Sequence, residues 1–260
     1  MPRFSANLSF LFQEVPFLDR FAAAASAGFR AVEFMSPYEY SPEAVAECLA
    51  ASRLENVLFN LPMGDWASGE RGLACLPGRE EDFRRSVATA LSYARVLKTP
   101  RLHAMAGIVP PGAARVCEST YIANLRYAAE QLAAAGLTLL IEPINTRDMP
   151  GYFLNTQAQA AKICAAVGLP NLKIQMDCYH MQIAEGDLAT NLRRYADLCA
   201  HVQIAGVPER HEPDTGEVNY NYLFELLDQI GYPGWIGCEY RPAGTTLDGL
   251  GWFKPWAAAP

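Results

Sequence analysis

The chain has 260 residues, 51% of them hydrophobic, and a formal net charge of -7. This length and apolar content suit one sizeable core, as in a single α/β barrel. Because the balance is acidic and the charges are mixed along the chain, the composition argues against a nucleic-acid surface and favours small molecules as partners.

The amino-terminal stretch MPRFSANLSF lacks the basic region and long apolar run of a signal peptide, and no later run is long enough to span a membrane. We therefore expect a cytoplasmic protein with no membrane partner. The 7 cysteines are widely scattered and form no C-x-x-C pair. They are expected to be reduced thiols in the core.

Apolar runs typical of buried strands alternate with helical stretches along the whole chain. The predicted strands cover residues 3–7, 31–34, 54–60, 101–105, 138–142, 172–177, 201–205 and 235–239. The predicted helices cover residues 16–27, 42–51, 80–97, 116–135, 156–167, 188–199 and 222–229. This alternation, without a linker or a break in composition, favours a single (β/α)8 TIM barrel domain over residues 1–260. A doubly wound open sheet is the alternative.

Polar residues stand at the end of every predicted strand, where such barrels carry their active sites. The early strand ends carry Asn7, Glu33, Asn60 and His103, and the late ones carry Glu142, Asp177, Gln203 and Glu239. Strand ends can be polar simply because loops begin there. Buried carboxylates among apolar neighbours are costly, however, unless a metal or a dedicated partner compensates them. The late quartet therefore predicts a site for a hard divalent cation.

Long connections follow several of these strands. The segment 61–80 contains Trp66 and Arg71 and suits a lid over a small ligand, although it could equally be a packing excursion. The connection after Gln203 brings Arg210 towards the same rim, and the one after Glu142 adds Arg147. Cations at this rim would suit an anionic substrate.

Several motifs together resemble the hydroxypyruvate isomerase family, and the resemblance covers nearly the whole chain. They are PRFSANLSFLF, FNLPMGDWASGERGLACLPGREEDFR, LLIEPINTRDMPGYFL, LKIQMDCYHMQIAEGDL, HVQIAGVPERHEPDTGEVNYNYLF and GYPGWIGCEYRP. The resemblance implies a barrel like that of xylose isomerase. The 2-oxotetronate isomerases share the PRF-ANLS start and the GWIGCEY end. Ketose 3-epimerases are a more distant resemblance, and they typically carry a histidine where this chain has Gln203.

The resemblance also implies roles for individual residues. Glu142, Asp177, Gln203 and Glu239 would bind the metal, and Glu142 and Glu239 would also act as the acid/base pair. His180, in a loop leaving its strand, would contact the substrate. We expect Arg210 to grip the substrate carboxylate through a bidentate contact, and we expect Asn7 and Trp66 to contact the substrate as well. Glu33 and Asn60 would orient ligands.

The implied reaction converts hydroxypyruvate into tartronate semialdehyde through an enediolate, by moving a proton between adjacent carbons. A divalent cation chelated by the substrate would stabilise the developing charge. The oxygen-only ligand set favours Mg or Mn, with Co as an alternative. The partner is thus a small anionic hydroxy-oxo acid, and 2-oxotetronate is the alternative substrate.

Other classes of function stay open at this stage. A DNA-repair endonuclease would need several metal-binding histidines and a basic face, whereas this chain has 4 histidines and a net negative charge. A non-catalytic sugar-acid binding protein would not need two flanking carboxylates. Trp252, Phe253 and Trp256 could support a homo-oligomer, or they could simply cap the barrel.

Overall fold

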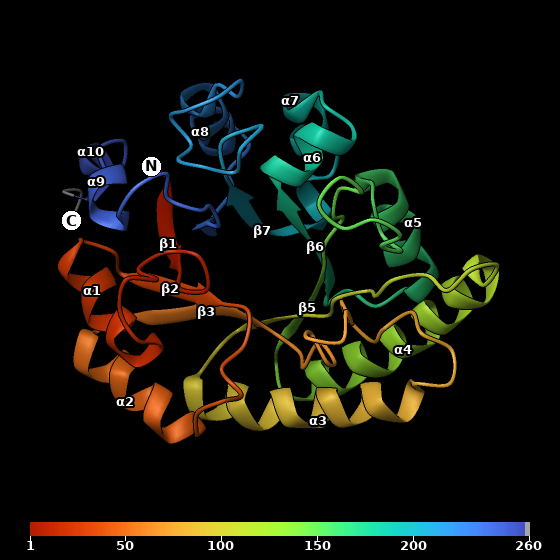
Figure 1. Cartoon of the computed structure of the whole chain (residues 1–260). Coiled ribbons are helices and arrows are strands. Elements are labelled where there is room, and N and C mark those ends of the chain that lie inside the picture. The colour runs from red at the N-terminus through yellow and green to blue at the C-terminus, as the bar shows by residue number, and fades with distance from the viewer. Residues whose placement is uncertain (258–260) are drawn as a thin grey trace.

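A computed structural model of the chain describes residues 1–257, and its centre is a closed barrel of parallel strands (Figure 1). The strands pair in chain order, and the last closes on the first. They are β1 (Arg3–Asn7), β2 (Ala31–Phe34), β3 (Glu55–Asn60), β4 (Arg101–His103), β5 (Thr138–Ile141), β6 (Leu172–Asp177), β7 (Cys199–Ile204) and β8 (Trp235–Cys238). The predicted (β/α)8 barrel is therefore confirmed.

Helices surround the barrel and cover the outer faces of its strands (Figure 1). They are η1 (Phe17–Asp19), α1 (Arg20–Ser26), α2 (Pro42–Ser52), α3 (Glu80–Leu97), α4 (Ala114–Ala134), α5 (Gln157–Val167), α6 (Cys178–Ala184), α7 (Leu188–Arg194), η2 (Ala196–Leu198), α8 (Tyr220–Gln229), α9 (Thr246–Gly249) and α10 (Lys254–Ala257).

Local capping explains where the helices begin and end. The Ser41 side chain accepts a hydrogen bond from the Ala44 amide at the start of α2, and Thr156 does the same for Gln159 at the start of α5. Helix α5 ends at Val167 and is capped by Gly168, whose φ of 73° lies in the left-handed region that glycine adopts without strain. The sequence predicted α3 with its observed bounds.

Two predictions about the helices were wrong in detail. The helix expected over residues 188–199 ends at Arg194, and β7 already begins at Cys199. Helix α6 was not predicted, because its seven residues directly follow β6 and leave no turn signal between strand and helix. The Asp177 side chain caps α6 by accepting a hydrogen bond from the Tyr179 amide.

Side chains alternate between the two sides of each strand, which separates an apolar shell from a polar barrel interior. In β1, Phe4 packs outwards against Phe224 of α8, with ring centroids 5.1 Å apart. Ser5 and Asn7 point inwards instead, and both donate hydrogen bonds to the buried Glu33 of β2. The apolar shell thus holds the helices, and the polar interior leads up to the carboxyl ends of the strands.

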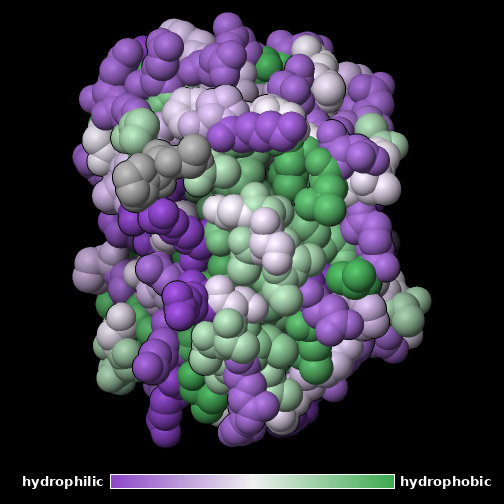
Figure 2. All heavy atoms as spheres, turned by 90° about the vertical axis from the view of Figure 1, so that its left-hand side faces the viewer, coloured by the Kyte–Doolittle hydropathy of each residue, from purple (hydrophilic) through white to green (hydrophobic). Residues whose placement is uncertain are grey.

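The carboxyl-terminal segment packs against the outside of β1. Phe4 forms aromatic contacts with Trp252, Phe253 and Trp256. Apolar and weakly polar residues also gather on the side of the molecule that carries α1, α9 and α10 (Figure 2). Trp252, Phe253 and Trp256 thus have packing partners within a single chain. No helix within residues 1–257 is long and apolar enough to cross a membrane.

Candidate active site

A cavity of about 610 Å³ opens at the carboxyl ends of the strands, where barrels of this kind hold their ligands. Nearly all of the site residues that the sequence predicted line this cavity. The lining includes Asn7, Trp66, Glu142, His180, Gln203, Arg210 and Glu239. Asp177 does not line the cavity, but it belongs to the cluster of ionisable side chains beside it.

Three carboxylates and one histidine converge in this cluster. Glu142, Asp177, His180 and Glu239 each offer one potential ligand atom, and these atoms all lie within 4.8 Å of one another. The four residues are buried, between 1% and 8% exposed. They come from the ends of β5, β6 and β8 and from the first turn of α6. Buried like charges this close need a compensating cation.

The protonation equilibria reflect that crowding. Burial, together with the neighbouring charges of Glu239 and Asp177, holds the pKa of Glu142 well above its usual 4.5. Burial raises the pKa of Glu239 to about 8, although Arg210 opposes the rise. Burial likewise raises the pKa of Asp177 to about 6. A bound cation would therefore stabilise the ionised form of each of these three carboxyl groups.

Two carboxylate oxygens in the cluster lack a hydrogen-bond partner among the described residues. They are Glu142 Oε1 and Asp177 Oδ2, and both are buried. A buried acceptor without a donor is unfavourable by itself, and a metal ion satisfies such an atom directly. Oxygen donors of this type suit Mg²⁺ or Mn²⁺.

The fully buried Glu33 anchors the wall of the site next to this cluster. Its carboxylate accepts hydrogen bonds from four side chains: Ser5 (2.8 Å), Asn7 (3.2 Å), His201 (2.8 Å) and Gln203 (2.7 Å). A Cβ at Gly237 would lie 2.3 Å from Glu33 Oε1, so only glycine leaves room for this carboxylate. The expectation that Glu33 orients a site residue agrees with its contact to Gln203.

The amide of Gln203 is held in one orientation. Its Nε2 donates to Glu33, so Oε1 faces the opposite way and accepts a hydrogen bond from Gln175 Nε2 at 2.6 Å. The sequence analysis overlooked Gln175. The signal for it was present, because Gln175 lies two residues before Asp177 on one strand and therefore points to the same side.

His180 lies on helix α6, not in a loop as predicted, because the helix begins directly after Asp177. The Asp148 amide donates to Asn145 Oδ1 at 2.8 Å, which turns the Asn145 NH₂ group towards His180 Nδ1, 2.6 Å away. Nδ1 must therefore accept a hydrogen bond, and the proton of the neutral ring is on Nε2. That N–H group lies 3.7 Å from Asp177 Oδ2.

The protonated Nε2 explains how His180 can act. A nitrogen that carries a proton cannot bind a metal, whereas it can donate a hydrogen bond to a ligand oxygen. Burial and the nearby charge of Arg210 also hold the pKa of His180 well below its usual 6.5, which keeps the ring neutral. His180 can therefore donate a hydrogen bond from its Nε2–H group inside the cavity.

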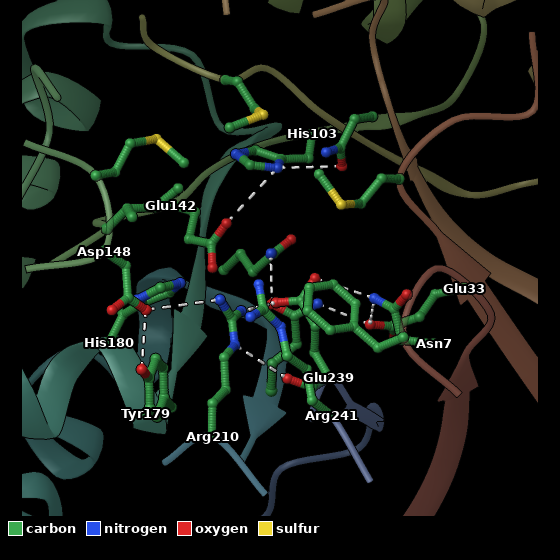
Figure 3. A pocket seen from close by; sticks show the side chains of 18 of the residues that line it. Asn7, Glu33, His103, Glu142, Asp148, Tyr179, His180, Arg210, Glu239 and Arg241 are labelled. Carbon is green, nitrogen blue, oxygen red and sulfur yellow. Dashed lines mark hydrogen bonds and ion pairs between the residues drawn. The ribbon is translucent and has the colours of Figure 1, made fainter. Parts of the chain in front are cut away.

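Asn7 and Arg210 both hold Glu239. Asn7 Nδ2 donates to Glu239 Oε1 at 3.1 Å, and Arg210 Nη2 donates to Glu239 Oε2 at 2.9 Å. The Arg210 guanidinium also lies 3.8 Å from Asp148 (Figure 3). It lies 3.7 Å from Asp177. Arg210 lines the cavity, but its charge is shared among these protein carboxylates.

His103 and Asn60 form the opposite wall. His103 Nδ1 lies 3.2 Å from Asn60 Oδ1 and 3.8 Å from Glu142 Oε2. At the mouth of the cavity, Trp66 is 41% exposed and stacks on Arg71, whose guanidinium carbon lies 3.9 Å from the ring centroid. The segment 61–79 thus places an aromatic ring and a cation over the site.

A parallel eight-stranded barrel with buried acid/base groups gathered at the carboxyl ends of its strands defines an α/β barrel enzyme. The xylose isomerase-like TIM barrel family model matches residues 21–256. The chain therefore belongs to this family.

Among curated proteins, the chain is similar to isomerases over their full length. The chain is 60% identical to the 2-oxo-tetronate isomerase of Cupriavidus necator, over 98% of this chain and 99% of that protein. It is 51% identical to the hydroxypyruvate isomerase of Escherichia coli, over 98% of this chain and 100% of that protein.

Solved structures agree with the fold. A Brucella melitensis structure described as an AP endonuclease of family 2 is 52% identical, with a TM-score of 0.97 over 98% of this chain and 99% of that one. The 3-keto-D-glucoside 4-epimerase of E. coli has a TM-score of 0.80 at 21% identity, over 98% and 99% of the two chains. This second likeness concerns the fold alone.

Proposed function

We propose that this protein is a metal-assisted isomerase of a short hydroxy-oxo acid, moving a proton between adjacent carbons through an enediolate. Its membership of the isomerase class rests on curated relatives that carry isomerase names over their full length. The observation that carries the mechanism is the meeting of Glu142 and Glu239, two buried carboxylates whose oxygens lie within 4.8 Å in one cluster.

Two substrates are candidates. Hydroxypyruvate would give tartronate semialdehyde, and the 51% identical relative supports this substrate. 2-Oxotetronate would give 3-oxotetronate, and the 60% identical relative supports this substrate equally well. A cavity of about 610 Å³ can hold either acid. Both reactions need the same proton transfer beside a carbonyl group.

Glu142, Asp177, Gln203 and Glu239 would hold the cation, with Mg or Mn preferred and Co as an alternative. The unpartnered oxygens of Glu142 and Asp177 fit this assignment. When bound, the cation would supply Lewis-acid stabilisation of the negative charge that develops on the substrate oxygens. The oxygen of the Gln203 amide points away from Glu33 and accepts one hydrogen bond from Gln175, so its second lone pair would serve the cation.

The residues of this chain supply the proton transfer and its geometry. One of Glu142 and Glu239 takes the proton from the carbon that bears the hydroxyl group, and the other assists its return. Asn7 and Arg210 keep the Glu239 carboxylate in place through hydrogen bonds of 3.1 and 2.9 Å. His180 donates its Nε2–H to a substrate oxygen. Arg210, Asn7 and Trp66 contact the substrate from the cavity wall.

Proton NMR in deuterated buffer tests this function. The protein is stripped of metal and assayed with and without Mn²⁺ against hydroxypyruvate, 2-oxotetronate and a free ketose. Metal-dependent product and deuterium incorporation with one acid support the isomerase and identify its substrate. Turnover of the ketose alone would instead indicate an epimerase, and binding without deuterium incorporation would indicate a sugar-acid binding protein. Cleavage of abasic-site DNA would contradict the proposal.

We also propose a cytoplasmic location, and we propose that the protein forms homo-oligomers. Leu247, 66% exposed, belongs to helix α9 next to the aromatic carboxyl-terminal segment and could extend an apolar contact. Light scattering coupled to size exclusion measures the oligomeric state directly. A mass near the 28.5 kDa of one chain would contradict the oligomer.

A further inference from the structure

The substrate proposed above carries a carboxylate that must find a cation in the cavity. Four arginines line that cavity: Arg71, Arg147, Arg210 and Arg241. A carboxylate binds best to a guanidinium that is held in place and is not already neutralised by an acidic neighbour. These two conditions separate the four arginines.

Two of the four are already paired with acidic residues. The guanidinium of Arg210 donates to Glu239 and lies within 3.8 Å of Asp148 and Asp177. Arg147 lies 3.8 Å from Asp148 and donates to the Pro208 carbonyl. A substrate carboxylate at either position would have to compete with protein carboxylates for the same charge.

Arg241 has no acidic partner among residues 1–257, but nothing fixes its guanidinium. Its side chain is exposed, and only its backbone forms hydrogen bonds within the described chain, to Arg210 and His211. An exposed arginine side chain without fixed partners loses conformational entropy when it binds a ligand. It is therefore a poor anchor for a small anion.

Arg71 meets both conditions. Its Nη1 donates to the backbone carbonyls of Trp66 (3.0 Å) and Glu70 (2.7 Å), and its guanidinium carbon lies over the Trp66 ring, 3.9 Å from the centroid. Within the described chain no carboxylate forms an ion pair with it. Nε and Nη2 of Arg71 have no hydrogen-bond partner among residues 1–257, and these two atoms are a pair of donors suited to a bidentate contact.

Glu70 is the acidic neighbour of Arg71 in sequence, but its carboxylate binds other residues. Glu70 accepts hydrogen bonds from the Arg79 side chain and from the Asp65 amide. The hydrogen bond from Arg79 lowers the pKa of Glu70, which keeps this carboxylate ionised and engaged with Arg79. Glu70 is consequently not available to neutralise Arg71.

The backbone next to Arg71 is fixed to the barrel. Gly72 pairs with Ala106 in an antiparallel bridge, and a Cβ at Gly72 would lie 2.3 Å from the Met105 carbonyl oxygen. Its φ of 112° also favours glycine. Gly72 thus lets the loop approach the end of β4 closely, and Arg71 is held over the cavity.

We infer that Arg71, stacked on Trp66, is the carboxylate-binding residue of this site and selects acids over neutral ketoses. This inference rests on the proposed function for the identity of the substrate. It assigns the carboxylate to Arg71 in place of Arg210, whose charge serves Glu239 and Asp177.

Arg71→Met tests the assignment, and Arg84→Met is the matched control. Arg84 also lies over an aromatic ring, that of Tyr127 at 5.3 Å, but it is on α3 and does not line the cavity. For the acid that the wild type isomerises, Arg71→Met should raise KM roughly 10- to 100-fold and change kcat much less, since one charge-assisted contact is lost. Arg71→Lys should recover part of the loss.

A neutral analogue in which CH₂OH replaces the carboxylate separates charge recognition from structure. Dihydroxyacetone serves for hydroxypyruvate, and erythrulose serves for 2-oxotetronate. Slow turnover of the analogue should be the same in wild type and Arg71→Met. An unchanged KM for the acid, or equal losses with acid and analogue, would overturn the assignment.

Calorimetric titration with D-glycerate, an unreactive acid of similar size, keeps the test independent of turnover. If the wild type isomerises neither acid, the proposed function fails, yet weaker D-glycerate binding by Arg71→Met still supports the carboxylate site. Equal D-glycerate binding by wild type and Arg71→Met would overturn the assignment. So would the absence of D-glycerate binding by the wild type.

Discussion

Replacing Glu33 tests whether one buried carboxylate supports both the barrel interior and the proposed metal site. Glu33 is 0% exposed and accepts four side-chain hydrogen bonds, two on each oxygen. Burial alone would raise its pKa, but the His201 ring and the hydrogen bonds from His201, Gln203 and Ser5 outweigh burial, so the pKa is lowered from 4.5. Glu33 is therefore ionised inside the barrel.

Glu33→Gln should be tolerated with a moderate cost. The glutamine carbonyl can still accept from Asn7 and Gln203, and its NH₂ group then faces Ser5 and His201. The Ser5 hydroxyl can rotate to accept, and His201 can move its proton to Nδ1, which has no partner in the wild type. What is lost is the charge assistance, about 1 kcal/mol for each of two retained bonds. The proton moved to His201 Nδ1 has no acceptor there and adds about 1 kcal/mol at most if water reaches it, so we expect a total of about 2–3 kcal/mol.

Glu33→Ala should cost more, because four buried donors lose their acceptor. At about 1–3 kcal/mol for each unsatisfied group, the free energy of unfolding should fall by at least ~4 kcal/mol. For a chain of this size each kcal/mol lowers Tm by about 2–4 °C. Glu33→Gln should therefore melt about 4–12 °C lower than the wild type, and Glu33→Ala at least ~8 °C lower.

Two measurements check these numbers. Thermal unfolding followed by circular dichroism reports stability, with Glu55→Gln as a control on an exposed residue of β3. Manganese titration reports the site, and Glu33→Ala should bind about 10- to 100-fold more weakly because Gln203 loses its support. If Glu33→Ala melts within 2 °C of the control and binds manganese normally, Glu33 does not anchor this site.

The remaining predictions concern the site itself. Glu142→Gln and Glu239→Gln should each lower turnover by at least ~10³-fold with unchanged circular dichroism, and near-normal turnover in either would refute the two-carboxylate mechanism. Gln203→Ala should weaken manganese binding in a titration, and an unchanged titration would remove Gln203 from the ligand set. Metal at 100 times its Kd should stabilise the stripped protein by about 2.7 kcal/mol, or about 5–11 °C in Tm, and an unchanged Tm would argue against a metal site here. Asn145→Asp should move the His180 proton from Nε2 to Nδ1, which ¹⁵N NMR of the imidazole ring detects; an unmoved proton would contradict the tautomer assigned above.

The sequence predicted the barrel well because its signals are local. Buried parallel strands are nearly continuous apolar runs, and the residues that end β6, Asp177, and follow β8, Glu239, stand out against them. Once the barrel is recognised, its geometry brings the strand ends together. That Glu142, Asp177 and Glu239 converge could thus be expected without coordinates.

Partners within the site could not be predicted in the same way. That Arg210 donates a hydrogen bond to Glu239 depends on how a long loop folds back over the strand ends. The orientation of His180 depends on the Asp148 amide, which fixes Asn145 first. Such contacts join residues far apart in sequence, and no periodic pattern records them.

The charges of the site explain why two arginines can have different roles. Glu142, Asp177 and Glu239 with Arg210 sum to -2 when all are ionised, which one divalent cation would cancel. The positive charge of Arg210 therefore offsets negative charge of the protein's own carboxylates. If the substrate carboxylate also bound to Arg210, one negative charge in the site would stay uncompensated. Arg71, whose neighbour Glu70 is engaged by Arg79, stands outside this charge balance. Its positive charge remains available for the one negative charge that the substrate adds.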